Sequence, residues 1–135
     1  MTDATTGYSL HAVTEHPFDD AVARAREELA KEGFGVLTEI DAQATLKAKL
    51  GVDRDPYVIL GACNPALAHQ ALGAEPELGV LLPCNVVVYV HGGQTHVSAV
   101  DAERMLGGLV GNPALEPVAR DVRDRLARVV ERTAG

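Results

Sequence analysis

Two short, uninterrupted apolar runs constrain this chain most. They cover residues 57–62 and 86–90, and neither shows the alternation of apolar and polar residues that is typical of a strand with one wet face. Both runs are therefore predicted to be strands with two buried faces. The sheet that they form needs a cover on each side, which is provided either by helices on both faces or by a second subunit on one face.

Other periodicities complete the outline of the fold. Alternating residues predict further strands at 7–14, 35–40 and 95–100, the last joined to 86–90 by a tight turn. Apolar residues at helical spacing predict helices, and cap residues mark their starts at Asp41, at Asn64-Pro65 and at Asn112-Pro113. We expect an α/β (α+β) fold: a single two-layer domain over residues 7–135, with helices packed on a mixed sheet of about five strands. Residues 1–6 are predicted to be a disordered tail.

Composition excludes several classes of function. The formal net charge of −7 argues against a sequence-independent grip on nucleic acid, which needs a basic surface. No stretch approaches the roughly 18 apolar residues of a membrane span, and residues 1–6 lack the pattern of a signal peptide. The expected location is the cytoplasm, where the two cysteines are expected to be thiols.

The best candidate site lies at two Cys-Asn dipeptides. Cys63-Asn64 closes the first apolar run and Cys84-Asn85 opens the second, so both lie where a strand meets a turn. Cys63 directly precedes a predicted helix N-terminus, whose positive dipole end favours the thiolate. His69, about a turn and a half into that helix, could reach back as a base. The alternative is that Cys63 is a small buried apolar residue, as free cysteines commonly are.

Other polar residues could complete a pocket. Asn85 could donate hydrogen bonds to a ligand. Glu39, at the end of a predicted strand, could face a pocket and pair with Lys47 on the following helix. Cys84 could lie close to Cys63 if the strands that carry them are antiparallel or if residues 80–82 fold back, and it lies at the opposite end of the sheet if the strands form a parallel crossover. We expect two separate thiols.

Neither a metal nor a cofactor is predicted. The residues that could bind zinc are Cys63, His69, Cys84, His91 and His96. Their spacing matches no established zinc pattern, and a zinc site needs three or four ligands.

Several segments together resemble a known family. They are residues 33–41, 45–47, 57–65, 67–69, 75–76 and 81–88, followed by Asp101 and Met105-Leu106. In this order they resemble the domain-of-unknown-function family DUF302 over about residues 8–110, with a less typical C-terminal helix at 113–133. The resemblance implies a small α/β protein of bacterial or archaeal type, without an established activity or cofactor, in which both Cys-Asn segments recur.

The leading hypothesis is a homodimeric module that binds a small ligand or has a regulatory role, with a pocket near the Cys-Asn dipeptides. Its ligand-binding residues are expected to be Asn64, Cys84, Asn85, Glu39 and Lys47. The alternative is a thiol-dependent enzyme or redox sensor that uses Cys63 and His69. A second alternative is a metal-binding protein. The sequence leaves open whether the protein is an enzyme.

Overall fold

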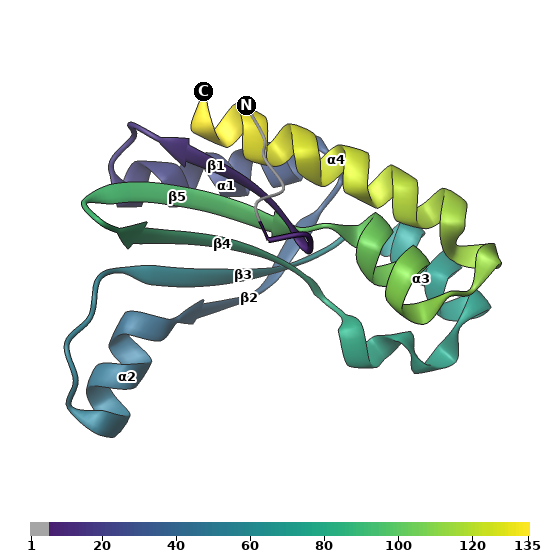
Figure 1. The fold of residues 1–135 in the computed structure, drawn as a ribbon, viewed down its shortest axis with the longest axis horizontal. Helices are drawn as coiled ribbons and strands as arrows, with labels where there is room; N and C mark the ends of the chain where they lie inside the picture. The colour runs from purple at the N-terminus through teal and green to yellow at the C-terminus, as the bar shows by residue number, and fades with distance from the viewer. Residues whose placement is uncertain (1–5) are drawn as a thin grey trace.

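A computed structural model describes residues 6–135, so the predicted disordered tail lies outside the described residues except for Thr6. The chain alternates strands and helices (Figure 1). The strands are β1 (Ser9–Thr14), β2 (Gly35–Asp41), β3 (Tyr57–Cys63), β4 (Cys84–His91) and β5 (Gln94–Val100). The α-helices are α1 (Phe18–Lys31), α2 (Ala42–Leu50), α3 (Pro65–Ala74) and α4 (Glu116–Ala134). Shorter helical segments are η1 (Pro76–Leu81), the π-helix η2 (Glu103–Val110) and η3 (Pro113–Leu115).

The described strands form one five-stranded sheet in the order β1-β5-β4-β3-β2, and all neighbouring strands are antiparallel. The predicted α/β class with about five strands is confirmed, but the prediction of a mixed sheet is wrong. The reason lies in the connection between β3 and β4. Its helix α3 packs against η1, η3 and α4 beyond the strand ends instead of crossing the sheet, so the chain returns antiparallel.

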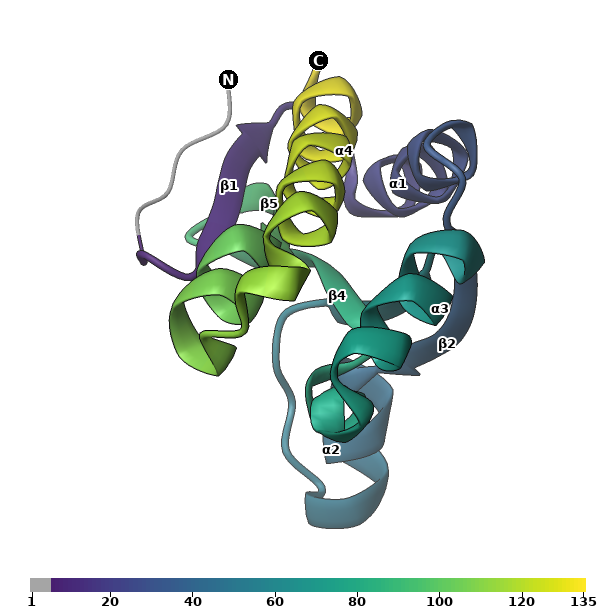
Figure 2. The same cartoon turned by 90° about the vertical axis from the view of Figure 1, so that its right-hand side faces the viewer.

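Helices α1 and α4 cover one face of the sheet and pack against each other (Figures 1 and 2). Their apolar stripes meet the strand residues that point toward them, and Leu29 of α1 and Leu126 of α4 are fully buried. Burying a leucine side chain stabilises a fold by about 1.5–3 kcal/mol. The core is almost wholly aliphatic, with Phe34 as its buried aromatic residue among the described part of the chain.

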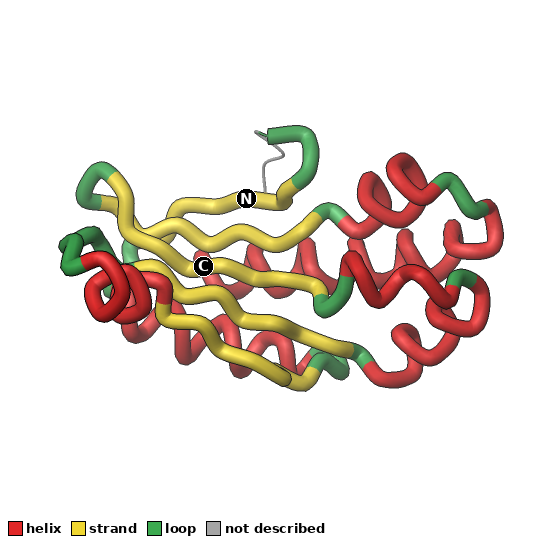
Figure 3. The backbone as a smooth tube through the Cα atoms, turned by 90° about the horizontal axis from the view of Figure 1, so that it is seen from below, coloured by secondary structure: helices red, strands yellow, loops and turns green. Residues whose placement is uncertain are grey.

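Apart from α2, which stands at one end of it, none of the described helices covers the opposite face of the sheet, as the view from below shows (Figure 3). We call this surface the open face. The strand register and the alternation of side chains along each strand define it. Its side chains belong to Ser9, His11, Val13, Thr38, Ile40, Tyr57, Ile59, Asn85, Val87, Tyr89, His91, Gln94, His96, Ser98 and Val100.

Local signals set the helix boundaries as the sequence predicts. The Asp41 side chain accepts a hydrogen bond from the Ala44 N–H, and the Asn64 side chain accepts one from the Leu67 N–H. Helix α1 ends at Lys31, and Gly33, two residues further on, has a φ of 83° that only glycine adopts easily. The last helix starts at Glu116 rather than 113, because residues 113–115 form a 3₁₀ turn capped by Asn112.

Candidate functional site

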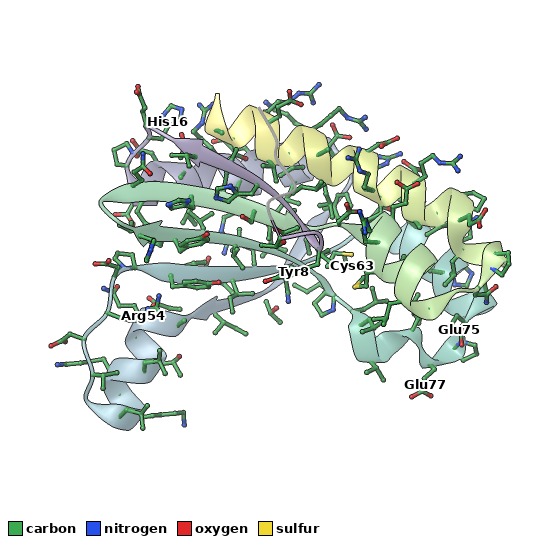
Figure 4. The ribbon with its side chains drawn as sticks, viewed as in Figure 1. Tyr8, His16, Arg54, Cys63, Glu75 and Glu77 are labelled. Atoms are coloured by element: carbon green, nitrogen blue, oxygen red, sulfur yellow. The ribbon has the colours of Figure 1, made fainter. Side chains whose placement is uncertain are left out.

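The two cysteines line one small cavity between the end of the sheet and the helices. Strands β3 and β4 are antiparallel, and Ala62 pairs with Cys84, so Cys63 and Cys84 lie on neighbouring strands. Both are free thiols. Figure 4 shows Cys63 at the end of the sheet where α3 begins, opposite the end that carries Arg54. The cavity measures about 40 Å³ and is lined mainly by apolar side chains. A site of this size holds one or two water-sized molecules.

Asn64 anchors the start of α3 to the end of α1. Its amide nitrogen donates to the carbonyl oxygen of Glu32 at 3.4 Å, while its amide oxygen caps α3. A Cβ atom at Gly33 would lie 3.0 Å from this amide nitrogen, so a larger residue at position 33 would crowd the Asn64 side chain. Asn64 lines the cavity, but both ends of its side chain are engaged in holding the two helices.

The environment of Cys84 makes it an unreactive thiol. Burial, reinforced by the nearby Cys63, raises the pKa of the Cys84 thiol from 9.0 to about 11. The thiolate is the nucleophile in cysteine chemistry, so a raised pKa suppresses reactivity at neutral pH. Cys84 is buried among the apolar residues of the core.

We expect Cys84 to be alkylated slowly below pH 9 and faster as the pH approaches 11. A shift of about two units lowers the thiolate fraction at neutral pH about 100-fold, and burial slows access further. The measurement is iodoacetamide labelling of a Cys63→Ser variant, followed by mass spectrometry, with the urea-unfolded protein as reference. Labelling of the folded variant at the unfolded rate at pH 7 would contradict the expectation.

The structure separates several residues that the sequence analysis grouped. His69 is exposed on α3 and does not line the cavity that holds Cys63. Glu39 forms an ion pair with Arg26 of α1. Lys47 instead pairs with Asp53 at 2.8 Å. Neither the Cys63–His69 pair nor the Glu39–Lys47 pair is brought together.

Asn85 lies apart from the cysteine cavity because of strand geometry. Consecutive residues of a strand point to opposite faces, so Cys84 enters the core while Asn85 projects from the open face. There it contributes to a depression of about 270 Å³, which we call the Asn85 depression. The depression is lined by Tyr8, Ser9, Tyr57, Asn85, Val87, Ser98, Ala99 and Val100.

A row of stacked rings crosses the open face, and we call Tyr57, Tyr89, His96 and His11 the aromatic ladder. Successive ring centroids are 5.1, 4.8 and 5.1 Å apart. The Arg54 guanidinium lies 5.0 Å from the Tyr57 ring, and His11 Nε2 lies 2.9 Å from His96 Nδ1. The sequence analysis missed this cluster, since the four rings meet only through pairing across four strands. Each strand contributes a single ring, so no local pattern in the sequence indicates the cluster.

Two further findings concern metal ligands and membrane spans in the described part of the chain. Within residues 6–135 no three His, Cys, Asp or Glu side chains are grouped so that they could hold a metal ion. The helices of the same region include none with the length and apolarity needed to cross a bilayer.

The fold and site define a small antiparallel α/β protein with one helix-covered and one open sheet face. The family model described as "Domain of unknown function DUF302" matches residues 10–133, which include all of α4 except Ala134. The chain therefore belongs to the DUF302 family, and the resemblance seen in the sequence is confirmed.

A solved structure agrees with this assignment. It is described as the crystal structure of an uncharacterized conserved protein DUF302 from Bacillus stearothermophilus. It is 34% identical in sequence, with a TM-score of 0.86 over 93% of this chain and 98% of that chain. No curated protein matches the chain.

Proposed function

We propose that this protein is a homodimeric module that binds a small, neutral, polar ligand in the Asn85 depression, beside the second Cys-Asn dipeptide. The observation that carries the proposal is the lining of this depression. It combines hydroxyl groups and one amide with apolar surface, and none of the described residues that line it carries a formal charge. A charged ligand would lose its hydration there without gaining an ion pair.

Size and chemistry favour this depression over the cysteine cavity. Its volume of about 270 Å³ lies just below the 300–1,000 Å³ range of common ligand sites, whereas the cysteine cavity measures about 40 Å³. The Asn85 amide offers both donors and an acceptor, and it is exposed. A ligand with a carbonyl or hydroxyl group could therefore pair with Asn85 while it rests on the Tyr57 ring.

The test is a ligand-observed NMR screen with neutral fragments that carry carbonyl and hydroxyl groups. We expect weak binding to the wild type, and affinity about two- to tenfold lower in Asn85→Ala, because a neutral hydrogen bond contributes about 0.5–1.5 kcal/mol. Gln94→Ala is the matched control, since Gln94 is exposed on the same face but outside the depression. Fragments that bind both variants equally, or bind none of the three proteins, would refute the proposal.

A thiol-based redox sensor is the second candidate, and one observation favours it: Cys63 and Cys84 line the same cavity. Peroxide would oxidise the two thiols to a disulfide and form two molecules of water. An enzyme that uses Cys63 has less support, because His69 does not line that cavity. Fast alkylation of Cys63 near pH 7 would favour a thiol function, and slow labelling of both cysteines would exclude it.

A further inference from the structure

The open face has an unusual composition for the surface of this protein. Charged residues make up 23% of the chain, yet no strand side chain on the open face belongs to Asp, Glu, Lys or Arg. Its apolar side chains are those of Val13, Ile40, Tyr57, Ile59, Val87, Tyr89 and Val100. Val13 is 44% exposed and Ile40 is 48% exposed. Contiguous apolar surface of this kind marks an interaction site.

The aromatic ladder makes this face rigid as well as apolar. Each ring is half-buried against its neighbours across the strands, so little side-chain entropy remains to be lost on association. Tyrosine and arginine are enriched among the residues that dominate binding energy, and Tyr57, Tyr89 and Arg54 lie together here.

Helix α2 gives a second, independent observation. It stands on the open-face side of the sheet, below the strands in Figure 1 and in front of them in Figure 3. None of its nine residues is buried, and Leu50 is 69% exposed. Isolated helices shorter than about 12–15 residues are marginal in water, and most helical stability comes from packing. A partner on the open face would also cover α2.

The size of this surface matches that of a stable interface. Five strands about 4.8 Å apart, each about seven residues long at 3.4 Å per residue, give a flat area of roughly 500 Å². Helix α2, about 13 Å long and 10 Å wide, adds roughly 130 Å². Accessible surface exceeds its flat projection, so the two together approach the roughly 800 Å² that each partner contributes to a standard interface.

Charge favours a second copy of this chain over another partner. Two copies with a net charge of −7 repel each other, and this repulsion is smallest where the facing surfaces lack carboxylates. In a two-fold interface the same patch lies on both sides, with residue i of one copy against residue j of the other, so a patch without charged strand residues meets no like charge from the partner's strands. A strongly charged protein or nucleic acid would find no opposite charge on the strands of this face.

We propose that a second copy of this chain packs on the open face in a two-fold symmetric dimer, with α2 of each copy beside the sheet of its partner. This inference rests on the homodimer of the proposed function and names its surface. The dimer also closes the Asn85 depression, because Asn85 and Tyr57 belong to the same face.

The test is sedimentation velocity and light scattering of the full chain from low to high micromolar concentration. We expect a species of twice 14.2 kDa for the wild type. Ile40→Lys, Ile59→Lys and Leu50→Lys should each weaken the dimer by roughly 100-fold, since burying an unpaired charge at an interface is costly. Leu72→Lys is the matched control, because Leu72 is an exposed leucine on α3 and should leave the dimer intact. Circular dichroism shows which variants fold.

The outcomes separate this inference from the proposed function. A wild type that stays monomeric overturns the inference and the homodimer of the proposed function, but not its ligand site if fragments still bind. A dimer that only Leu72→Lys disrupts overturns the inference alone. Hydrogen exchange gives a readout without mutation, since α2 amides should lose protection when the wild type is diluted to monomer. Unchanged protection overturns the placement of α2. A dimer that binds no fragment refutes the ligand proposal and leaves the interface standing.

Discussion

Glu32→Gln is expected to lower the free energy of unfolding by about 2–3 kcal/mol. The Glu32 carboxylate lies at the C-terminal end of α1, where the helix dipole disfavours negative charge. Arginines of α4 compensate: Arg128 donates to both carboxylate oxygens at 2.8 and 3.0 Å, and Arg132 donates at 3.1 Å. The Glu32 side chain is only 10% exposed. Hydrogen bonds to charged groups contribute about 1.5–3 kcal/mol, and the half-exposed arginines recover part of the loss through water.

The same carboxylate predicts a pH dependence. The hydrogen bond from Arg128, together with the charges of Arg128, Arg132 and Arg125, holds the pKa of Glu32 below its ordinary value of 4.5 although burial opposes this. A carboxyl whose pKa is lower in the folded state stabilises the fold above its unfolded pKa. The stability difference between wild type and Glu32→Gln should therefore be constant near neutral pH and shrink as the pH falls below about 4.5.

Urea unfolding at a series of pH values measures both effects. Glu27→Gln is the matched control, because Glu27 is exposed on the same helix, and its effect should stay within about 0.5 kcal/mol. Equal stability of the Glu32 and Glu27 variants near neutral pH would show that the arginines do not stabilise the junction of α1 and α4.

Gly61→Ala is expected to destabilise the protein by about 2–3 kcal/mol. A Cβ atom at this position would overlap Thr38 Oγ1 of the neighbouring strand and lie 2.9 Å from Pro83 Cγ. The side chain of Thr38 is short and that of Pro83 is cyclic, so neither can shift without a cost in free energy. Overpacking of this kind costs about 1–3 kcal/mol. Thermal or urea unfolding of the variant measures the loss.

A double variant tests the cause. Thr38→Ala removes the hydroxyl, so Gly61→Ala combined with Thr38→Ala should recover about 1 kcal/mol relative to the sum of the single variants. Gly73→Ala is the control, because nothing lies within 4 Å of its added Cβ atom. Alanine is about 1 kcal/mol better than glycine within a helix, so Gly73→Ala should stabilise the protein. Additive losses in the double variant would assign the cost of Gly61→Ala to Pro83 alone.

Part of the candidate site could be predicted from the sequence. The sequence identified Cys63, Asn64 and Cys84, which line one cavity, and Asn85, which lines another. It grouped Asn85 with Cys84 because they are adjacent in sequence, although adjacent residues of a strand face opposite sides of the sheet. The aromatic ladder was not predicted from the sequence. Its rings come from four strands, so predicting their stacking requires knowing the register of those strands.

The sequence by itself determined the strands, the helices, the cap residues and the family of this protein. Periodicity and caps act over a few residues, so the chain carries that information locally. Only the tertiary structure decided the antiparallel strand order, the separation of His69 from Cys63 and the existence of the open face. These features depend on which distant segments pair, and the free energy of that pairing is set by packing across the whole sheet rather than by any local stretch.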